Sequence, residues 1–147
     1  MDIDHRAPLK ARKEIVINAP IETVWALLTD IERWPEWQPD ISFAKLEDRL
    51  KVGTVFRWKA KGLSIVSTIQ HLEPRGGIGW TGRSLGMRAV HVWTLEPWGN
   101  GVHVASEESL AGWLAQTMKL FDSSFLDKSL EASLRLLKSQ AEQQQTL

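Results

Sequence analysis

The sequence predicts an α+β fold in which a curved antiparallel sheet of about seven strands wraps around one long C-terminal helix. Between residues 41 and 110, segments with the two-residue period of strands follow one another through short connections. After Gly112 the chain continues to about Gln140 without glycine or proline, and its apolar residues recur at helical spacing. A sheet must bury one face, and this helix is the long apolar element that can cover it, so the two are expected to pack together.

The first elements are a short strand and two short helices. The β-branched run of Glu14–Asn18 predicts the first strand. Pro20 suits the first turn of a helix, and the apolar residues after it recur at i, i+3, i+4 and i+7, which predicts a helix over Pro20–Thr29. Pro35 and Pro39 each disfavour helix at the preceding residue, so a second short helix and a turn are expected there.

Further strands are expected in the middle of the chain. The connections between them are short, which makes sequential strands antiparallel neighbours. The result is a meander, with the first strand added at an edge. The predicted strands are Ile41–Leu46, Gly53–Ala60, Leu63–Leu72, Ile78–Arg83, Met87–Leu95 and Val102–Leu110.

The C-terminal helix, predicted over Leu110–Gln140, carries two apolar faces. Its first half presents one stripe, and its second half presents leucines on a different face. Either the helix bends near Ser123 and Ser124, or its second half touches apolar surface on two sides, as in a homodimer. The first stripe is Leu114, Met118, Phe121 and Phe125, and the second is Leu126, Leu130, Leu134 and Leu137.

The composition indicates one domain that spans residues 1–147, with an N-terminal extension over 1–12 and a polar tail over 141–147. The 147 residues are 43% hydrophobic, enough for a core of their own. Lysine plus arginine equals aspartate plus glutamate, 18 each, which argues against a nucleic-acid partner. The absence of cysteine excludes disulfides and thiolate chemistry. No apolar segment has the length of a signal or a membrane span, so a cytoplasmic location without stable membrane insertion is expected.

Several segments resemble a known superfamily. The run from Ile17 to Trp25 and the later Trp34-Pro35-Glu36-Trp37 resemble the opening of SRPBCC (START-like, birch-pollen-allergen-like) proteins, particularly the polyketide cyclase/dehydrase-like branch. Gly53–Phe56, Leu72–Pro74 and the pair Glu108 and Gly112 also resemble that branch in place and spacing. The resemblance implies the helix-grip fold, with a cavity between sheet and helix. It also implies hydrophobic small-molecule ligands, and cyclisation or dehydration in some members.

A histidine and a glutamate are predicted to face each other inside that cavity. In Met87–Leu95 the alternate residues that include His91 and Trp93 are expected to point inward. A four-residue loop after this strand would place His91 opposite Glu108, whereas a slip of one residue would place it opposite Glu107. Such a pair could exchange protons with a ligand near neutral pH, although a purely structural hydrogen bond is the commoner role.

The same alternation predicts a largely apolar pocket for a flat or aromatic ligand, and the eight tryptophans supply bulky walls. The alternative is that these side chains simply fill the interior. The four histidines are scattered, and no phosphate-binding loop is present, so neither a metal nor another cofactor is expected. The predicted pocket residues are Phe56, Trp58, Ile65, Ser67, Ile69, Trp80, Trp93, Leu114, Met118, Phe121 and Phe125.

Three functions follow, in order of preference. The first is binding of a hydrophobic or aromatic small molecule, lipid-like or polyketide-like, in the cavity. The second is a cyclase or dehydratase that uses His91 and Glu108 for proton transfer. The third is an interaction protein that self-associates through the C-terminal helix.

Overall fold

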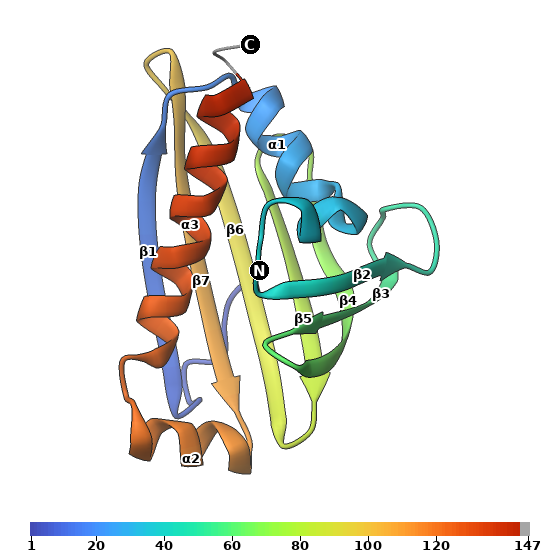
Figure 1. Cartoon of the computed structure of the whole chain (residues 1–147), viewed down its shortest axis with the longest axis vertical. Coiled ribbons are helices and arrows are strands. Elements are labelled where there is room, and N and C mark those ends of the chain that lie inside the picture. Colours follow the sequence, from blue (N-terminus) through green and yellow to red (C-terminus); the bar gives the residue numbers. More distant parts are fainter. Residues whose placement is uncertain (145–147) are drawn as a thin grey trace.

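The computed structural model describes residues 1–144 and confirms the predicted fold (Figure 1). A seven-stranded sheet has the order β1-β7-β6-β5-β4-β3-β2, and all its neighbouring pairs are antiparallel. The elements are β1 (Leu9–Ile17), α1 (Ile21–Thr29), the 3-10 helix η1 (Ile31–Glu36), β2 (Ile41–Leu46), β3 (Val55–Ala60), β4 (Leu63–Glu73), β5 (Gly77–Ser84), β6 (Met87–Trp98), β7 (Gly101–Ala111), α2 (Trp113–Phe121) and α3 (Phe125–Gln144).

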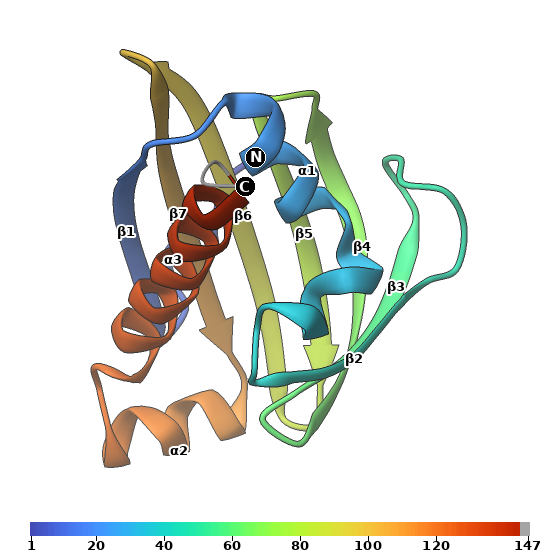
Figure 2. The same ribbon diagram turned by 45° about the horizontal axis from the view of Figure 1, so that its top comes forward.

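The sheet curves around the helices on its inner face (Figure 2). The register of β2 against β3 shifts between Ile41 and Phe43, and that of β4 against β5 shifts between Ile69 and His71. Such irregularities bend a strand and increase its twist. The curvature leaves a concave face, over which α1, η1 and α3 lie.

The first strand begins at Leu9 rather than at Glu14, so the prediction of an extension over residues 1–12 is wrong for its last part. Leu9 and Ala11 are buried while Lys10 and Arg12 are exposed, which is the alternation of a half-buried strand. The basic residues concealed this alternation in the sequence. The preceding residues also pack on the domain, since the backbone N–H of Asp4 donates to Ser109 Oγ at 3.0 Å.

The predicted single C-terminal helix is two helices, and Leu110 belongs to β7. Between α2 and α3, both the backbone N–H and the hydroxyl of Ser124 donate to Asp122 Oδ1, at 3.0 and 2.7 Å. Local bonds of this kind compete with the helix and favour a break. Of the two alternatives left open by the sequence, the bend near Ser123 and Ser124 is therefore present. The predicted polar tail is helical through Gln144, and residues 145–147 lie outside the described part of the chain.

Glycine is required where β7 turns into α2. Gly112 has a φ of 108°, and a Cβ at this position would collide with the carbonyl oxygen of Gly86. Only glycine combines this left-handed backbone with such a close approach. This turn sets the direction of α2, beside the connection between β5 and β6.

The leucine face of α3 packs on the sheet of the same chain. The four side chains are each at most 2% exposed, so they cannot form the dimer surface suggested by the sequence. The break before Phe125 leaves Leu114, Met118 and Phe121 of the first predicted stripe on α2, whereas Phe125 and the whole second stripe lie on α3. The buried leucines are Leu126, Leu130, Leu134 and Leu137.

Aromatic side chains form the centre of the larger core cluster. Phe56 is fully buried, with its ring centroid 5.7 Å from that of Trp34 and 5.6 Å from that of Trp80, both in edge-on contact. The indole N–H of Trp34 donates to the carbonyl of Leu28 at 3.1 Å, which joins α1 to η1. Edge-on aromatic pairs stabilise a core beyond the area that they bury. This cluster forms a rigid boundary for the space beneath α3.

Candidate ligand-binding cavity

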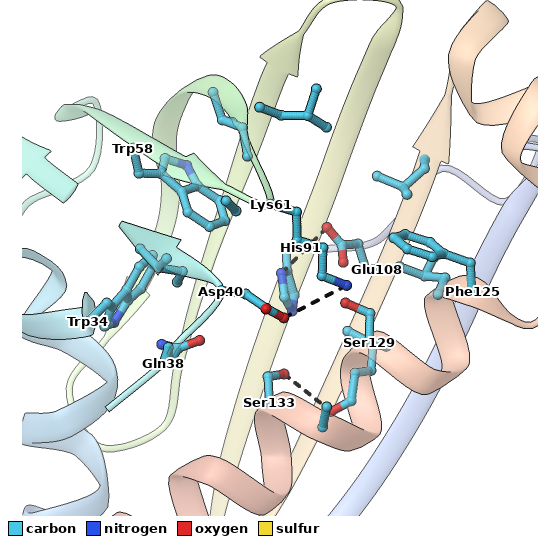
Figure 3. A pocket seen from close by; sticks show the side chains of 18 of the residues that line it. Trp34, Gln38, Asp40, Trp58, Lys61, His91, Glu108, Phe125, Ser129 and Ser133 are labelled. Atoms are coloured by element: carbon cyan, nitrogen blue, oxygen red, sulfur yellow. Dashed lines mark hydrogen bonds and ion pairs between the residues drawn. The ribbon is translucent and has the colours of Figure 1, made fainter. Parts of the chain in front are cut away.

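A cavity of about 390 Å³ lies between the concave face of the sheet and α3 (Figure 3). This volume falls in the range of sites for small organic ligands. Apolar side chains form most of the lining, and they come from α1, η1, the sheet and both C-terminal helices. They are Leu28, Trp34, Ile41, Trp58, Ala60, Leu63, Ile65, Trp80, Met87, Trp93, Leu110, Met118, Phe125, Leu126, Leu130, Ala132 and Leu136.

His91 and Glu108 face each other in this cavity, in the predicted register. The two residues are paired across β6 and β7, with His91 Nδ1 3.6 Å from Glu108 Oε2. The other ring nitrogen, Nε2, is hydrogen-bonded to Ser106 Oγ at 2.7 Å. The His91 ring contacts two indoles, with its centroid 5.0 Å from that of Trp80 across the sheet and 5.2 Å from that of Trp93 on the same strand. Strand register and aromatic packing therefore fix the imidazole.

Burial keeps both groups of this pair uncharged near neutral pH. Their side chains are only 11% and 17% exposed. Burial lowers the pKa of His91 to about 3. It raises the pKa of Glu108 to about 8, although the nearby charge of Lys61 opposes that rise. A neutral His91 therefore shares a hydrogen bond with Ser106 Oγ through Nε2 and faces Glu108 through Nδ1. The cavity thus holds a carboxyl proton donor without a buried net charge.

A lysine from the β3–β4 turn stands at the polar side of the cavity. Lys61 and Gly62 both have positive φ, 51° and 80°, as a two-residue hairpin turn of type I′ requires. Lys61 Nζ lies 3.9 Å from Asp40 Oδ2 and 4.6 Å from the centroid of the Phe125 ring. In Figure 3 this ammonium group lies beside His91 and Glu108, whereas Trp34 and Trp58 lie across the cavity. The cavity therefore has a polar side and an aromatic side.

The structure brings part of the predicted pocket together. Trp58, Ile65, Trp80, Trp93, Met118 and Phe125 line the cavity with His91 and Glu108. Phe56 and Ile69 are fully buried behind the lining, and Ser67 accepts the indole N–H of Trp58 at 3.0 Å. These three residues support the wall instead of forming it.

Two predicted residues on α2 lie outside the cavity. Leu114 is half-buried beside the β5–β6 turn, and Phe121 is 87% exposed. The prediction failed because it extended one helix through residues 110–140. With the break at Asp122–Ser124, the stripe that should have run along one rod is divided between two directions.

Sequence reasoning missed most of the polar lining. These side chains come from the segment after η1, the β3–β4 turn and α3. Ser129 and Ser133 carried a usable signal, since residues four apart share a helix face and these two adjoin the leucine stripe. The missed polar residues are Gln38, Asp40, Lys61, Lys128, Ser129 and Ser133.

Within residues 1–144, no group of three or more histidine, cysteine, aspartate or glutamate side chains is placed to hold a metal ion. No helix in the same part of the chain is both long and apolar enough to cross a membrane.

A curved antiparallel sheet around a C-terminal helix, with an apolar cavity between them, defines a START-like (SRPBCC) helix-grip protein. The chain belongs to the family described as polyketide cyclase/dehydrase and lipid transport, whose model matches residues 8–142. A search of curated protein sequences found no match.

Solved structures share this fold at low sequence identity. Hypothetical protein jhp0584 from Helicobacter pylori is 18% identical with a TM-score of 0.82, over 93% of this chain and 90% of that one. A START superfamily protein from Mycobacterium smegmatis is 18% identical with a TM-score of 0.74, over 91% and 97%. The di-domain ARO/CYC StfQ from the steffimycin biosynthetic pathway is 16% identical with a TM-score of 0.75, over 95% of this chain and 52% of that one.

Proposed function

We propose that the protein binds a hydrophobic or aromatic small molecule, lipid-like or polyketide-like, in the cavity between the sheet and α3. The observation that carries this proposal is the cavity of about 390 Å³ with a mostly apolar lining. An apolar ligand gains free energy in proportion to the area that it removes from water, roughly 25 cal/mol per Å². The flat indoles of Trp34, Trp58 and Trp80 suit a planar or unsaturated ligand. The family, with its cyclases and lipid transporters, points to the same ligand class.

The polar side of the cavity favours a ligand with one hydrogen-bonding end. A protonated Glu108 can donate to a carbonyl or hydroxyl oxygen, and Ser129 adds a hydroxyl group from α3. A small number of convergent polar groups in an apolar pocket fixes the orientation of a ligand. We therefore expect a mostly apolar molecule with an oxygen near Glu108.

Ligand binding is expected to raise the melting temperature. At a free ligand concentration about 100-fold above Kd, binding stabilises the folded state by about 2.7 kcal/mol, which corresponds to several degrees. Thermal unfolding with a panel of fatty acids, polyketides and polycyclic aromatics measures this shift. No shift with any member of a broad panel would count against the proposal.

A pair of serine variants on α3 locates the site. Ser129 lines the cavity, so Ser129→Trp should fill it and abolish the shift in melting temperature. Ser139 is exposed on the same helix and away from the lining, so Ser139→Trp should keep the full shift. Equal shifts for both variants would show that the ligand binds elsewhere.

A second candidate function is catalysis by the His91–Glu108 pair. The approach of Nδ1 to Oε2 within 3.6 Å, inside a ligand-sized cavity, favours it. A carboxyl group with a pKa of about 8 is a suitable general acid near neutral pH, for instance toward the departing hydroxyl of a dehydration. A pKa of about 3 makes His91 a weak base, which places catalysis second.

The conservative variant Glu108→Gln separates binding from catalysis. It keeps the shape and a hydrogen-bond donor but cannot transfer a proton. If the pair is catalytic, kcat for a cyclisation or dehydration should fall by about 10²–10⁴-fold, while Kd changes far less. Turnover that survives this substitution unchanged would remove the catalytic function and leave the binding function intact.

A further inference from the structure

A patch of large apolar side chains is exposed at one end of the molecule. Leu85 is 75% exposed, Trp113 63%, Leu120 86% and Phe121 87%. We call these four residues the α2 patch. Isolated apolar residues are normal on a protein surface, but a contiguous group marks a binding surface.

Three members of the α2 patch share one face of α2, and the exposed Gln116 and Thr117 lie between them. Trp113, Leu120 and Phe121 are spaced i, i+7 and i+8. The Trp113 ring packs on the β5–β6 turn beside Leu85, since a Cβ on Gly86 would lie 2.6 Å from that ring. The backbone N–H of Leu114 also donates to the carbonyl of Gly86 at 3.0 Å, which ties helix and turn together. Figure 1 shows α2 beside the end of the β5–β6 hairpin.

The patch adjoins the ligand cavity. Met118 belongs to α2 and lines the cavity with its opposite face. Met87 follows the β5–β6 turn directly and lines the same space, as does Phe125 at the start of α3. The residues that carry the exposed patch therefore also form one end of the cavity.

Basic residues that form no ion pair flank the patch. Arg83 and Arg88 are exposed and face each other across β5 and β6, on either side of the turn that carries Leu85. Neither arginine forms an ion pair within residues 1–144, and neither does Lys119 on α2. Two like charges directly opposite each other are unfavourable in a sheet unless an anion or a negative surface offsets them.

We propose that the α2 patch and its basic flank dock the protein on the surface of an anionic lipid bilayer. Tryptophan, phenylalanine and leucine on one helix face enter the boundary between headgroups and acyl chains, while arginine and lysine pair with anionic headgroups. Each basic residue near such a surface contributes modestly, so the contact is shallow and reversible. The end of the cavity then faces the source of a hydrophobic ligand.

A second copy of the chain fits this surface less well. In a two-fold dimer the same patch faces itself, which would bring Arg83, Arg88 and Lys119 of both copies together. A negatively charged bilayer does not meet this objection, because its headgroups pair with these basic side chains.

Vesicle co-sedimentation tests the docking directly. The wild-type protein should bind phosphatidylcholine vesicles that contain phosphatidylglycerol, and bind pure phosphatidylcholine weakly. Leu120→Ser with Phe121→Ser should reduce binding by about tenfold or more, because two apolar side chains are lost. Arg83→Gln with Arg88→Gln should reduce it on the order of tenfold and remove the preference for the anionic lipid. Both pairs are exposed, so the melting temperature of each variant checks that the fold is kept.

Trp98→Ser is the matched control. Trp98 is 58% exposed in the β6–β7 hairpin, at the end of the sheet away from α2 in Figure 1, and its loss should leave vesicle binding unchanged. Absence of binding by the wild type, or binding that survives the Leu120/Phe121 substitutions, would overturn the proposal. Self-association in sedimentation velocity that those substitutions abolish, without vesicle binding, would overturn it too and assign the patch to a dimer. None of these outcomes depends on a ligand, so ligand binding in the cavity is tested separately.

Discussion

Replacing Phe56 with alanine is expected to destabilise the protein by about 3–5 kcal/mol. The side chain is fully buried and lies in edge-on contact with Trp34 and Trp80. Its removal leaves a cavity that these large, fixed rings cannot close. Urea unfolding at equilibrium measures the loss as a lower midpoint with little change in slope.

Phe121→Ala is the matched control, because Phe121 is 87% exposed. Its free energy of unfolding should stay within about 0.5 kcal/mol of the wild-type value. If Phe121→Ala destabilised the chain as much as Phe56→Ala, the break between α2 and α3 would be wrong. The continuous helix that the sequence suggested would then be the better description.

Glu108→Gln is expected to become more stable than the wild type as the pH rises. Folding raises the pKa of Glu108 from 4.5 to about 8, so between these values the folded state keeps a proton that the unfolded state has lost. Rising pH therefore favours unfolding, by roughly 1.4 kcal/mol per pH unit for one proton. Glutamine does not titrate, so the free energy of unfolding of the variant lacks this decrease with pH.

His91 changes the free energy of unfolding with pH in the opposite direction to Glu108, and over a different pH range. Folding lowers its pKa from 6.5 to about 3, so its contribution to stability is lost as the pH falls below 6.5. Between pH 4.5 and 6.5, rising pH lowers the free energy of unfolding through Glu108 and raises it through His91, so the two effects oppose each other. Above pH 6.5 only the decrease due to Glu108 remains.

Urea unfolding over a pH series tests this linkage. The free energy of unfolding of Glu108→Gln minus that of the wild type should rise by roughly 4 kcal/mol between about pH 5 and pH 8. Glu107→Gln, at the preceding position of β7, controls for the loss of one carboxyl group from this strand. A difference between Glu108→Gln and wild type that stays constant with pH would show that Glu108 is ionised in the folded protein.

The sheet could be predicted because its signals are local. Glycine-containing turns and two-residue alternation set the meander, and placing Pro97 opposite Val102 across the turn after β6 put His91 opposite Glu108. The start of β1 could not be found in the same way. Lys10 and Arg12 there point to solvent, and the pairing that makes this segment a strand comes from β7, about a hundred residues away.

The cavity could be predicted only where it follows strand alternation. Trp58, Trp80 and Trp93 were found from the sheet, because neighbouring strands constrain their facing. Which residues of α2 and α3 line the cavity depends on where the predicted C-terminal helix breaks and on which face α3 then turns toward the sheet. That break rests on the hydrogen bonds between Ser124 and Asp122. Periodicity indicated a change of apolar face near Ser123 and Ser124, but it fitted a continuous helix with two apolar faces equally well.

The most direct test of the central claim is a ¹H–¹⁵N spectrum of the tryptophan indoles during titration with a ligand from the thermal screen. Trp58, Trp80 and Trp93 line the cavity, whereas Trp98 and Trp113 are 58% and 63% exposed outside it. Binding in the cavity should shift the indole resonances of the first three and leave those of the other two in place. Shifts confined to Trp98 or Trp113, with the cavity indoles unchanged at saturation, would contradict it.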